Sequence, residues 1–190
     1  MRYVSIDIET SGLDPEKHQI IEIACIVEDT DIEMDLRPNV LDLPKLQLYL
    51  RHDNINFNPV ALKMHTKLMQ AWNNNMKTVP DEVMRKLYNW LRENGFESKF
   101  TVAGKNFIGF DWQFLKKLHG SWRIKPRYRT LDPAILYYND DDEELPNMMD
   151  CAIRMNDSLP SDDQLVGVTV PHRAYEDAAL VIKLLRHMGI

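Results

Sequence analysis

The sequence predicts an α/β protein in which helices flank one central sheet, and three observations lead to this fold class. Residues 2–9 alternate between apolar and polar side chains, as a half-buried strand does. The run from His18 to Glu28 is apolar and β-branched for long enough to form a central strand. Helical periodicity recurs later, in its last stretch from about residue 173 to 188. Strands that precede helices favour one shared sheet, and 190 residues fit a single domain spanning 1–190.

Local signals predict the other elements. Residues 31–36 are expected to pair with the second strand as a hairpin, and residues 37–57, which show no clear period, to form a loop with one short element. Helices are expected to open at Asn58-Pro59 and at Pro80-Asp81. Further along the chain, the patterns predict a strand at 101–104, a helix at 107–118, a strand at 128–131, a helix start at Asp132-Pro133 and a variable polar stretch at 139–170.

Composition narrows the class of protein. The formal net charge of -6 argues against a protein that coats long stretches of nucleic acid, but not against an enzyme that grips a strand end through bound cations. Acids gather at 140–144, and bases gather at Lys116-Lys117 and from Arg123 through Arg129. No apolar stretch approaches the roughly 20 residues of a membrane span, and no signal peptide is visible. Two distant cysteines form neither a disulfide framework nor a zinc pattern, so we expect a cytoplasmic protein without membrane contact.

The most informative local feature is a pair of carboxylates at the end of the first strand. Asp7 and Glu9 lie two positions apart, so they point to the same face of the strand. Two acids on one face repel each other, and a divalent cation between their oxygens makes such a pair favourable. A charged edge strand that ends in a loop is the alternative interpretation.

Two further carboxylates fall inside apolar helical stripes. Asp111 and Asp177 each have apolar residues at helical spacing on the same face. An unpaired buried carboxylate is costly or stays protonated, so each acid needs a partner. A position at the rim of the stripe, or an arginine partner, would explain either acid alone. One cation site shared with Asp7 and Glu9 would explain all four acids together.

A histidine precedes the last of these acids. His172 follows Pro171 and is expected before or in the first turn of the C-terminal helix, from where it can lean toward Asp177. An isolated histidine at a helix start is usually a surface residue or a cap. Beside a metal cluster, a group that titrates near neutrality is suited to act as a general base.

These residues resemble the DEDD exonuclease superfamily, in the subgroup with a histidine in the third motif. The resemblance rests on three motifs that together span residues 7 to 177: Asp7-Ile8-Glu9-Thr10, Asn106-Phe107-Ile108-Gly109-Phe110-Asp111 and His172-Arg173-Ala174-Tyr175-Glu176-Asp177. The resemblance implies a ribonuclease H-like fold with a mixed sheet. It also implies removal of nucleotides from the 3′ ends of single-stranded DNA or RNA, with release of 5′-monophosphates.

The resemblance further assigns roles to residues. The catalytic set would be His172 as general base together with Asp7, Glu9, Asp111 and Asp177, and these four acids would bind two Mg²⁺ or Mn²⁺ ions. The segment 58–66 looks like the family helix that packs against the terminal nucleoside. The expected substrate-binding residues are Thr10, Gly12, Leu13, Met64, His65, Asn106 and Phe110. Plain core packing is the alternative for Met64 and Phe110.

Local similarity is greater to oligoribonucleases, which act on very short RNA. Gly12-Leu13-Asp14-Pro15 and Tyr128-Arg129-Thr130-Leu131-Asp132 read like that branch, whereas Asp-Ile-Glu-Thr in the first motif and Thr66-Lys67-Leu68 depart from it. DNA therefore stays open as the substrate. A catalytically silent nucleic-acid-binding adaptor and a different metal phosphohydrolase are alternatives; the intact acids and histidine argue against the first, and the second and third motifs against the second. A homodimer and docking to a polymerase or repair complex also stay open.

Overall fold

The computed structural model describes residues 1–170 and 172–190, and for Met64 its backbone only. Its centre is a mixed sheet with the strand order β4-β3-β2-β1-β6. β1 is antiparallel to β2, β2 is antiparallel to β3, and the two outer pairings, β1 with β6 and β3 with β4, are parallel. The five strands are β1 (Arg2–Thr10), β2 (Ile20–Asp29), β3 (Lys45–Leu50), β4 (Lys77–Thr78) and β6 (Val102–Ala103). A second, two-stranded sheet pairs β5 (Lys99–Phe100) with β7 (Lys125–Pro126).

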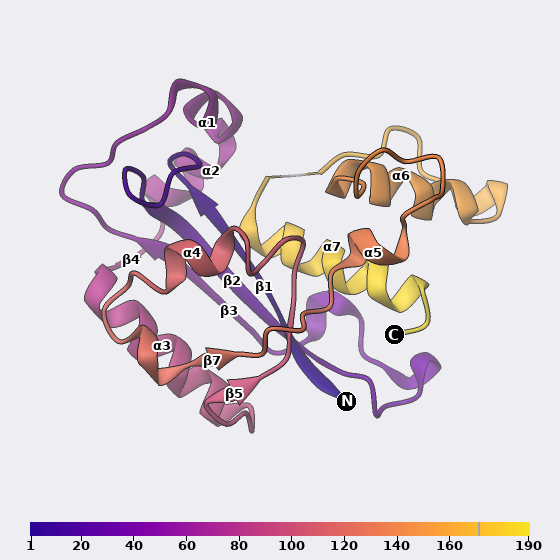
Figure 1. Cartoon of the computed structure of the whole chain (residues 1–190), viewed down its shortest axis with the longest axis horizontal. Helices are drawn as coiled ribbons and strands as arrows, with labels where there is room; N and C mark the ends of the chain where they lie inside the picture. The colour runs from indigo at the N-terminus through magenta and orange to yellow at the C-terminus, as the bar shows by residue number, and fades with distance from the viewer. Residues whose placement is uncertain (171) are drawn as a thin grey trace.

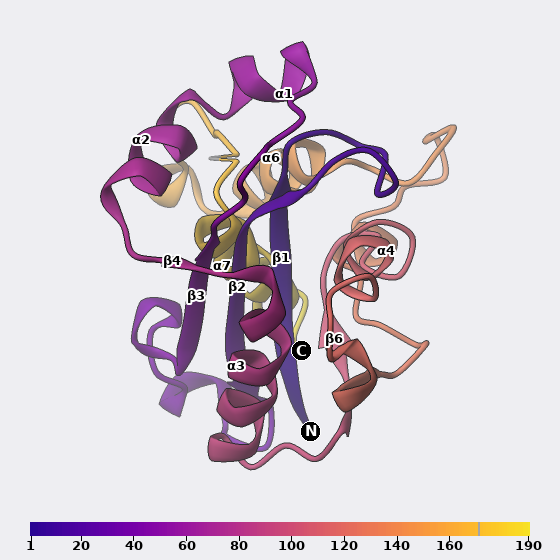
Figure 2. The ribbon, with the colours of Figure 1, turned by 90° about the vertical axis from the view of Figure 1, so that its left-hand side faces the viewer.

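Helices cover both faces of the central sheet (Figures 1 and 2). They are α1 (Pro59–Met64), α2 (Thr66–Asn74), α3 (Pro80–Glu93), α4 (Asp111–Leu115), α5 (Pro133–Leu136), α6 (Met148–Ser158) and α7 (Ala174–His187). Short 3-10 turns lie at Met34–Leu36, Val40–Asp42, Ser121–Arg123 and Ser161–Asp163. In the part of the chain that the structure describes, no helix combines the length and the apolar character needed to cross a membrane.

The alternation of side chains along β1 assigns each face of the sheet to its own helices. Val4, Ile6 and Ile8 are buried in one cluster with residues of α3 and α4. Tyr3 is buried in another cluster with residues of α7. Asp7 shares the parity of Tyr3, so the acidic residues of β1 face α7. Figure 2 shows α3 and α7 on opposite sides of the strands.

The predicted hairpin at 31–36 is wrong. These residues form a turn and a 3-10 helix, and the antiparallel partner of β2 is β3, in the segment expected to be mostly loop. The pattern Lys45-Leu46-Gln47-Leu48 is short, and its apolar residues become buried only against the neighbouring strand and α3. Which segment pairs with β2 depends on tertiary packing, and the local sequence pattern does not encode it.

Three other element boundaries differ from expectation. The helix expected over 107–118 is regular only in α4. Within the strand expected at 128–131 the structure has only a single bridge, between Leu131 and Ala103, and β7 lies before it at Lys125–Pro126. The stretch 139–170 is not uniformly irregular, because it contains α6. An Asn147–Asp150 capping box begins α6, and Cys151 and Ala152 are buried on its inner face.

Candidate active site

Three carboxylates from β1 and α7 converge beside the sheet. Ligand oxygens of Asp7, Glu9 and Asp177 all lie within 4.8 Å of one another. The period of two along β1 points Asp7 and Glu9 at α7. The Ser5 hydroxyl donates a 2.8 Å hydrogen bond to the Ala178 carbonyl and so holds the first turns of α7 against this strand. The predicted association of these three acids is therefore present in the fold.

Asp111 reaches the same place from the edge of the sheet. β6 pairs with β1 only at Val4 and Ser5, so the edge of β1 is left without a strand partner further on. There the backbone N–H of Ile8 donates to Asp111 Oδ1 at 3.1 Å. Asp111 is the first residue of α4 and only 5% exposed, so it lies at the start of a short helix rather than in the middle of the long one we expected.

Burial raises the pKa values of all four acids, and the charges of the neighbouring site acids raise those of Asp7 and Glu9 further. The pKa of Asp7 is raised well above its usual range, first by burial and then by the charges of Asp111, Glu9 and Asp177. Burial raises the pKa of Glu9 to about 9, that of Asp111 to about 8 and that of Asp177 to about 7. The four groups therefore cannot all be ionised near neutrality unless a positive charge joins them.

The donor set fits a hard divalent cation. Its ligands are carboxylates, which Mg²⁺ and Mn²⁺ prefer. Asp177 Oδ1 is buried and has no hydrogen-bond partner among the described residues. A buried anionic oxygen without a partner is costly, and a bound cation would satisfy it.

His172 lies at the entry to α7, as expected, and is exposed. It precedes the first residue of the helix, Ala174, and has a positive φ of 52°, which is uncommon for a residue other than glycine. Its charge lowers the pKa of His65, so the two imidazoles lie close enough to interact. The preceding residue, Pro171, lies outside the described residues.

His65 is an inner residue of the site. It follows α1, is 6% exposed, and places Nδ1 at 3.5 Å from Glu9 Oε2. Burial is the main cause of its lowered pKa, followed by the charge of His172. The sequence suggested a contact with substrate; the structure places the ring against a candidate metal ligand.

A buried ion pair behind the carboxylates was not anticipated. Glu22 is fully buried on β2 directly opposite Glu9, and Arg173 donates to it through Nε at 3.3 Å. Arg173 also donates to the Tyr49 hydroxyl at 2.7 Å. The backbone N–H of Ala174 donates to Glu22 Oε2 at 3.3 Å, which satisfies one free donor at the start of α7. The signal available in the sequence was a single acid inside the apolar run 20–27.

A pocket of about 270 Å³ lies at the end of β1, and its lining begins at Thr10, the residue after Glu9. Thr10, Gly12 and Leu13 line it from the loop after β1, together with Asn58, Val60 and Ala61. The Asn58 N–H donates to the Ser11 carbonyl at 2.8 Å, which ties the start of α1 to that loop. A Cβ at Gly12 would lie 2.5 Å from the His18 ring, so a larger residue there would require that ring to move. Leu13 is 80% exposed, a large apolar side chain available to a ligand.

His65, Asn106 and Phe110 are not among the described residues that line this pocket. Asn106 has a φ of 51°, and its N–H donates to Asp132 Oδ2 at 2.7 Å, so it shapes the loop that leads to Asp111. Phe110 is half-buried and packs on Phe114 with ring centroids 5.2 Å apart. The side chain of Met64 lies outside the described part of the chain.

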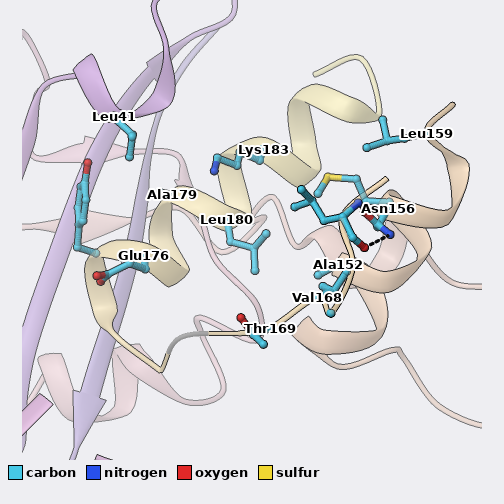
Figure 3. Close-up of a pocket in the computed structure, with 14 residues that line it drawn as sticks. Leu41, Ala152, Asn156, Leu159, Val168, Thr169, Glu176, Ala179, Leu180 and Lys183 are labelled. Carbon is cyan, nitrogen blue, oxygen red and sulfur yellow. Dashed lines mark hydrogen bonds between the residues drawn. The ribbon is translucent and has the colours of Figure 1, made fainter. Parts of the chain in front are cut away.

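A second pocket of about 340 Å³ lies between α6 and α7 (Figure 3). Figure 3 shows Asn156 and Leu159 on the side of α6, and Glu176, Leu180 and Lys183 on the side of α7. Its described lining residues include neither His172 nor any of the four candidate metal ligands. It is therefore separate from the carboxylate site.

A five-stranded mixed sheet with helices on both faces and acidic residues gathered at the end of its first strand defines the class of ribonuclease H-like nucleases. The family comparison agrees with this class. Residues 4–185 match the RNase_T family, which is described as exonuclease, and the chain belongs to this family of DEDD exonucleases.

Curated relatives and a solved structure extend the comparison. The oligoribonuclease of Vibrio cholerae serotype O1 is 29% identical over 133 residues, which cover 69% of this chain and 70% of that protein. The oligoribonuclease of Neisseria meningitidis serogroup C is 29% identical over 182 residues, covering 96% of this chain and 87% of that protein. The zinc-bound E. coli ExoI–ssDNA complex superposes with a TM-score of 0.61 at 12% identity, over 98% of this chain. The chain spans only 40% of that solved chain, and the likeness shows the fold.

Proposed function

We propose that residues 1–190 form one domain that acts as a metal-dependent 3′-5′ exonuclease on single-stranded nucleic acid and releases nucleoside 5′-monophosphates. The observation that carries this proposal is the convergence of Asp7, Glu9 and Asp177 within 4.8 Å, with Asp111 held beside them by the Ile8 N–H. Family membership supplies the class of reaction.

The four carboxylates would hold two Mg²⁺ or Mn²⁺ ions, as the resemblance to the DEDD exonuclease family implies. Bound ions of this kind polarise a phosphoryl oxygen and lower the pKa of a coordinated water. The raised pKa values of the acids support this role, because a cation would replace the protons that burial and repulsion otherwise retain.

His172 would accept the proton of the attacking water. It is exposed and can pass that proton on to solvent, whereas His65 is buried against Glu9. His65 would instead help to hold Glu9 in position. These separate environments favour His172 as the base.

The pocket beside Leu13 would hold the terminal nucleoside of the strand. Unpaired bases bind through contacts between their flat faces and apolar or aromatic side chains. Leu13 supplies an apolar side chain to this pocket. Thr10, which also lines it, directly follows Glu9 in the sequence. Its place between the loop after β1 and α1 supports the expectation for Thr10, Gly12 and Leu13.

A nuclease restricted to very short RNA is the second candidate, and the alignment with the Neisseria meningitidis oligoribonuclease over 96% of this chain favours it. The neighbour with the same fold is named as a complex with single-stranded DNA. A time course on labelled dinucleotide RNA, longer single-stranded RNA, single-stranded DNA and duplex DNA, each with Mg²⁺ or with EDTA, separates the two candidates.

We expect metal-dependent shortening of single strands from an open 3′ end. Asp7→Asn should abolish the shortening while its circular dichroism spectrum stays that of the wild type. Cleavage in EDTA, or undiminished cleavage by the folded Asp7→Asn variant, would contradict the metal-dependent assignment.

A further inference from the structure

The sequence concentrates positive charge in one segment that the proposed chemistry does not use. Residues 112–131 contain the six bases Lys116, Lys117, Arg123, Lys125, Arg127 and Arg129 and no acid, although the whole chain carries a net charge of -6. Lys117 is paired with Glu16. The bases of β7 and the residue after it have a different environment.

The small sheet places like charges side by side. Lys99 of β5 is the direct partner of Lys125 of β7, and Arg127 has the same parity as Lys125. Phe100 and Pro126 alternate with them, and Phe100 is buried, so the three bases share the exposed face. Like charges on directly opposite residues destabilise a sheet.

No carboxylate among the described residues forms an ion pair with this basic cluster, which consists of Lys99, Lys125 and Arg127. Glu97, which is two residues before Lys99, makes none either. A binding partner with negative charge would relieve the repulsion among the three bases.

The basic cluster borders a pocket of about 280 Å³ that reaches the second motif. Its apolar side is formed by Ile108, Trp112 and Ile124, and Trp112 directly follows Asp111 in the chain. Positive charge beside an apolar and aromatic surface is the combination that binds single-stranded nucleic acid, through phosphates and base faces together.

We propose that the basic cluster binds the phosphates of a single strand upstream of the 3′ end that is held at the carboxylates. The inference rests on the proposed function and extends it, because a strand that reaches the cluster must be longer than a dinucleotide. Because the protein as a whole is negatively charged, a local positive surface would lower the repulsion that a long strand meets as it approaches.

Affinity at several salt concentrations tests this proposal. Fluorescence anisotropy would measure the binding of a labelled dinucleotide and of a 20-nucleotide strand, each as DNA and as RNA, in an Asp7→Asn background that prevents cleavage. The double variant Lys99→Gln/Lys125→Gln should bind the long strand more weakly. The slope of log K against log salt should fall by about 1.4, at about 0.7 for each lost phosphate contact on single strands. Dinucleotide affinity should not change.

A matched control removes the same charge elsewhere. Lys45→Gln/Lys183→Gln also replaces two exposed lysines, and both lie on the α7 side of the sheet. This control should keep the wild-type slope. An unchanged slope in Lys99→Gln/Lys125→Gln, or an equal loss in the control, would overturn the proposal.

The outcome is distinguishable from a failure of the proposed function. If the protein cleaves dinucleotides and long strands, but the slope of log K against log salt is the same in Lys99→Gln/Lys125→Gln as in the wild type, the exonuclease assignment stands and the proposed role of the basic cluster is wrong. If the protein cleaves no substrate but binds long strands through these two lysines, the proposed role of the basic cluster stands and the exonuclease assignment is wrong. A wild-type chain that binds no long strand would overturn the cluster directly.

Discussion

Arg173 and Glu22 form an ion pair that connects the start of α7 to the middle of the sheet, with Arg173 Nε 3.3 Å from Glu22 Oε2. The Glu22 side chain is fully buried and that of Arg173 is 19% exposed. His172 lies immediately before Arg173, and Asp177 lies four residues after it, in the first turns of the helix. The pair therefore orients the segment that carries two of the candidate catalytic residues, while Glu9 lies opposite Glu22 on the next strand.

Glu22→Ala should reduce both stability and turnover. The change leaves the Ala174 N–H without its acceptor and removes the carboxylate that balances the charge of Arg173, and breaking one side of a buried pair costs about 3–5 kcal/mol. Urea unfolding measures the loss in stability, and kcat on a dinucleotide reports the position of His172. Glu22→Gln keeps an acceptor oxygen and should recover part of both. A Glu22→Ala protein with wild-type stability would show that the pair does not hold α7.

The stability of the metal-free protein should fall as pH rises from about 4 to 9. The folded pKa values of Glu9, Asp111 and Asp177, about 9, 8 and 7, lie above their ordinary values of 4.5, 3.8 and 3.8. The folded state therefore binds more protons than the unfolded state in this range, and the stabilisation present below pH 4 is lost as the pH passes these folded values. Thermal unfolding in EDTA measures the decline.

Two controls connect that decline to the carboxylate site. Saturating Mg²⁺ should raise the melting temperature most at the alkaline end of the range, because it binds the ionised form. Asp7→Asn removes a buried acid whose pKa is raised in the folded state, and it should make the metal-free protein more stable than the wild type at pH 9. A melting temperature that does not depend on pH in EDTA would contradict the raised pKa values.

His172→Ala should lower kcat by about 10²–10⁴, the range usual for loss of a general base, with KM nearly unchanged. Steady-state kinetics on a labelled dinucleotide measures both constants. His119→Ala is the control, because His119 packs on Trp122 in the turn after α4 and should keep wild-type kinetics. A raised KM with normal kcat would instead assign His172 to substrate binding.

Leu13→Ala should weaken substrate binding without unfolding the protein. Its side chain is 80% exposed and lines the pocket beside Thr10, so truncation removes ligand contact but little folded-state packing. A loss of about 1–2 kcal/mol of binding free energy corresponds to a 5–30-fold higher KM. Leu36→Ala, at another exposed leucine, should leave KM unchanged. A normal KM for Leu13→Ala would move the nucleoside site elsewhere.

The fold class and the acidic set were predictable because their signals are local. The alternation of period two in residues 2–9 predicts that Asp7 and Glu9 share a face of the strand. The helical spacing of apolar residues in α7 predicts that Asp177 lies in an apolar stripe. Asp111 was found for a partly different reason. Its expected helix is short, and the side chain is buried because it bonds the Ile8 N–H where β6 ends.

The partner of β2 and the network of Glu22 could not be read in the same way. β3 has a weak pattern, and its pairing depends on packing against α3 and β2. Glu22 looked like one acid in an apolar strand until Arg173, 151 residues later, was brought beside it. Contacts between residues so far apart in the sequence depend on how whole helices and strands pack, and local periodicity does not predict them.

By itself the sequence determined the α/β class, and it predicted that four acids and one histidine form a candidate site, because residue type and spacing indicate which face of its strand or helix each acid occupies. Only the tertiary structure decided that His65 packs against Glu9, that Glu22 and Arg173 hold the start of α7, and that Lys99 and Lys125 stand side by side. The physical reason is that burial, repulsion and pKa depend on distances between segments, and folding alone sets those distances.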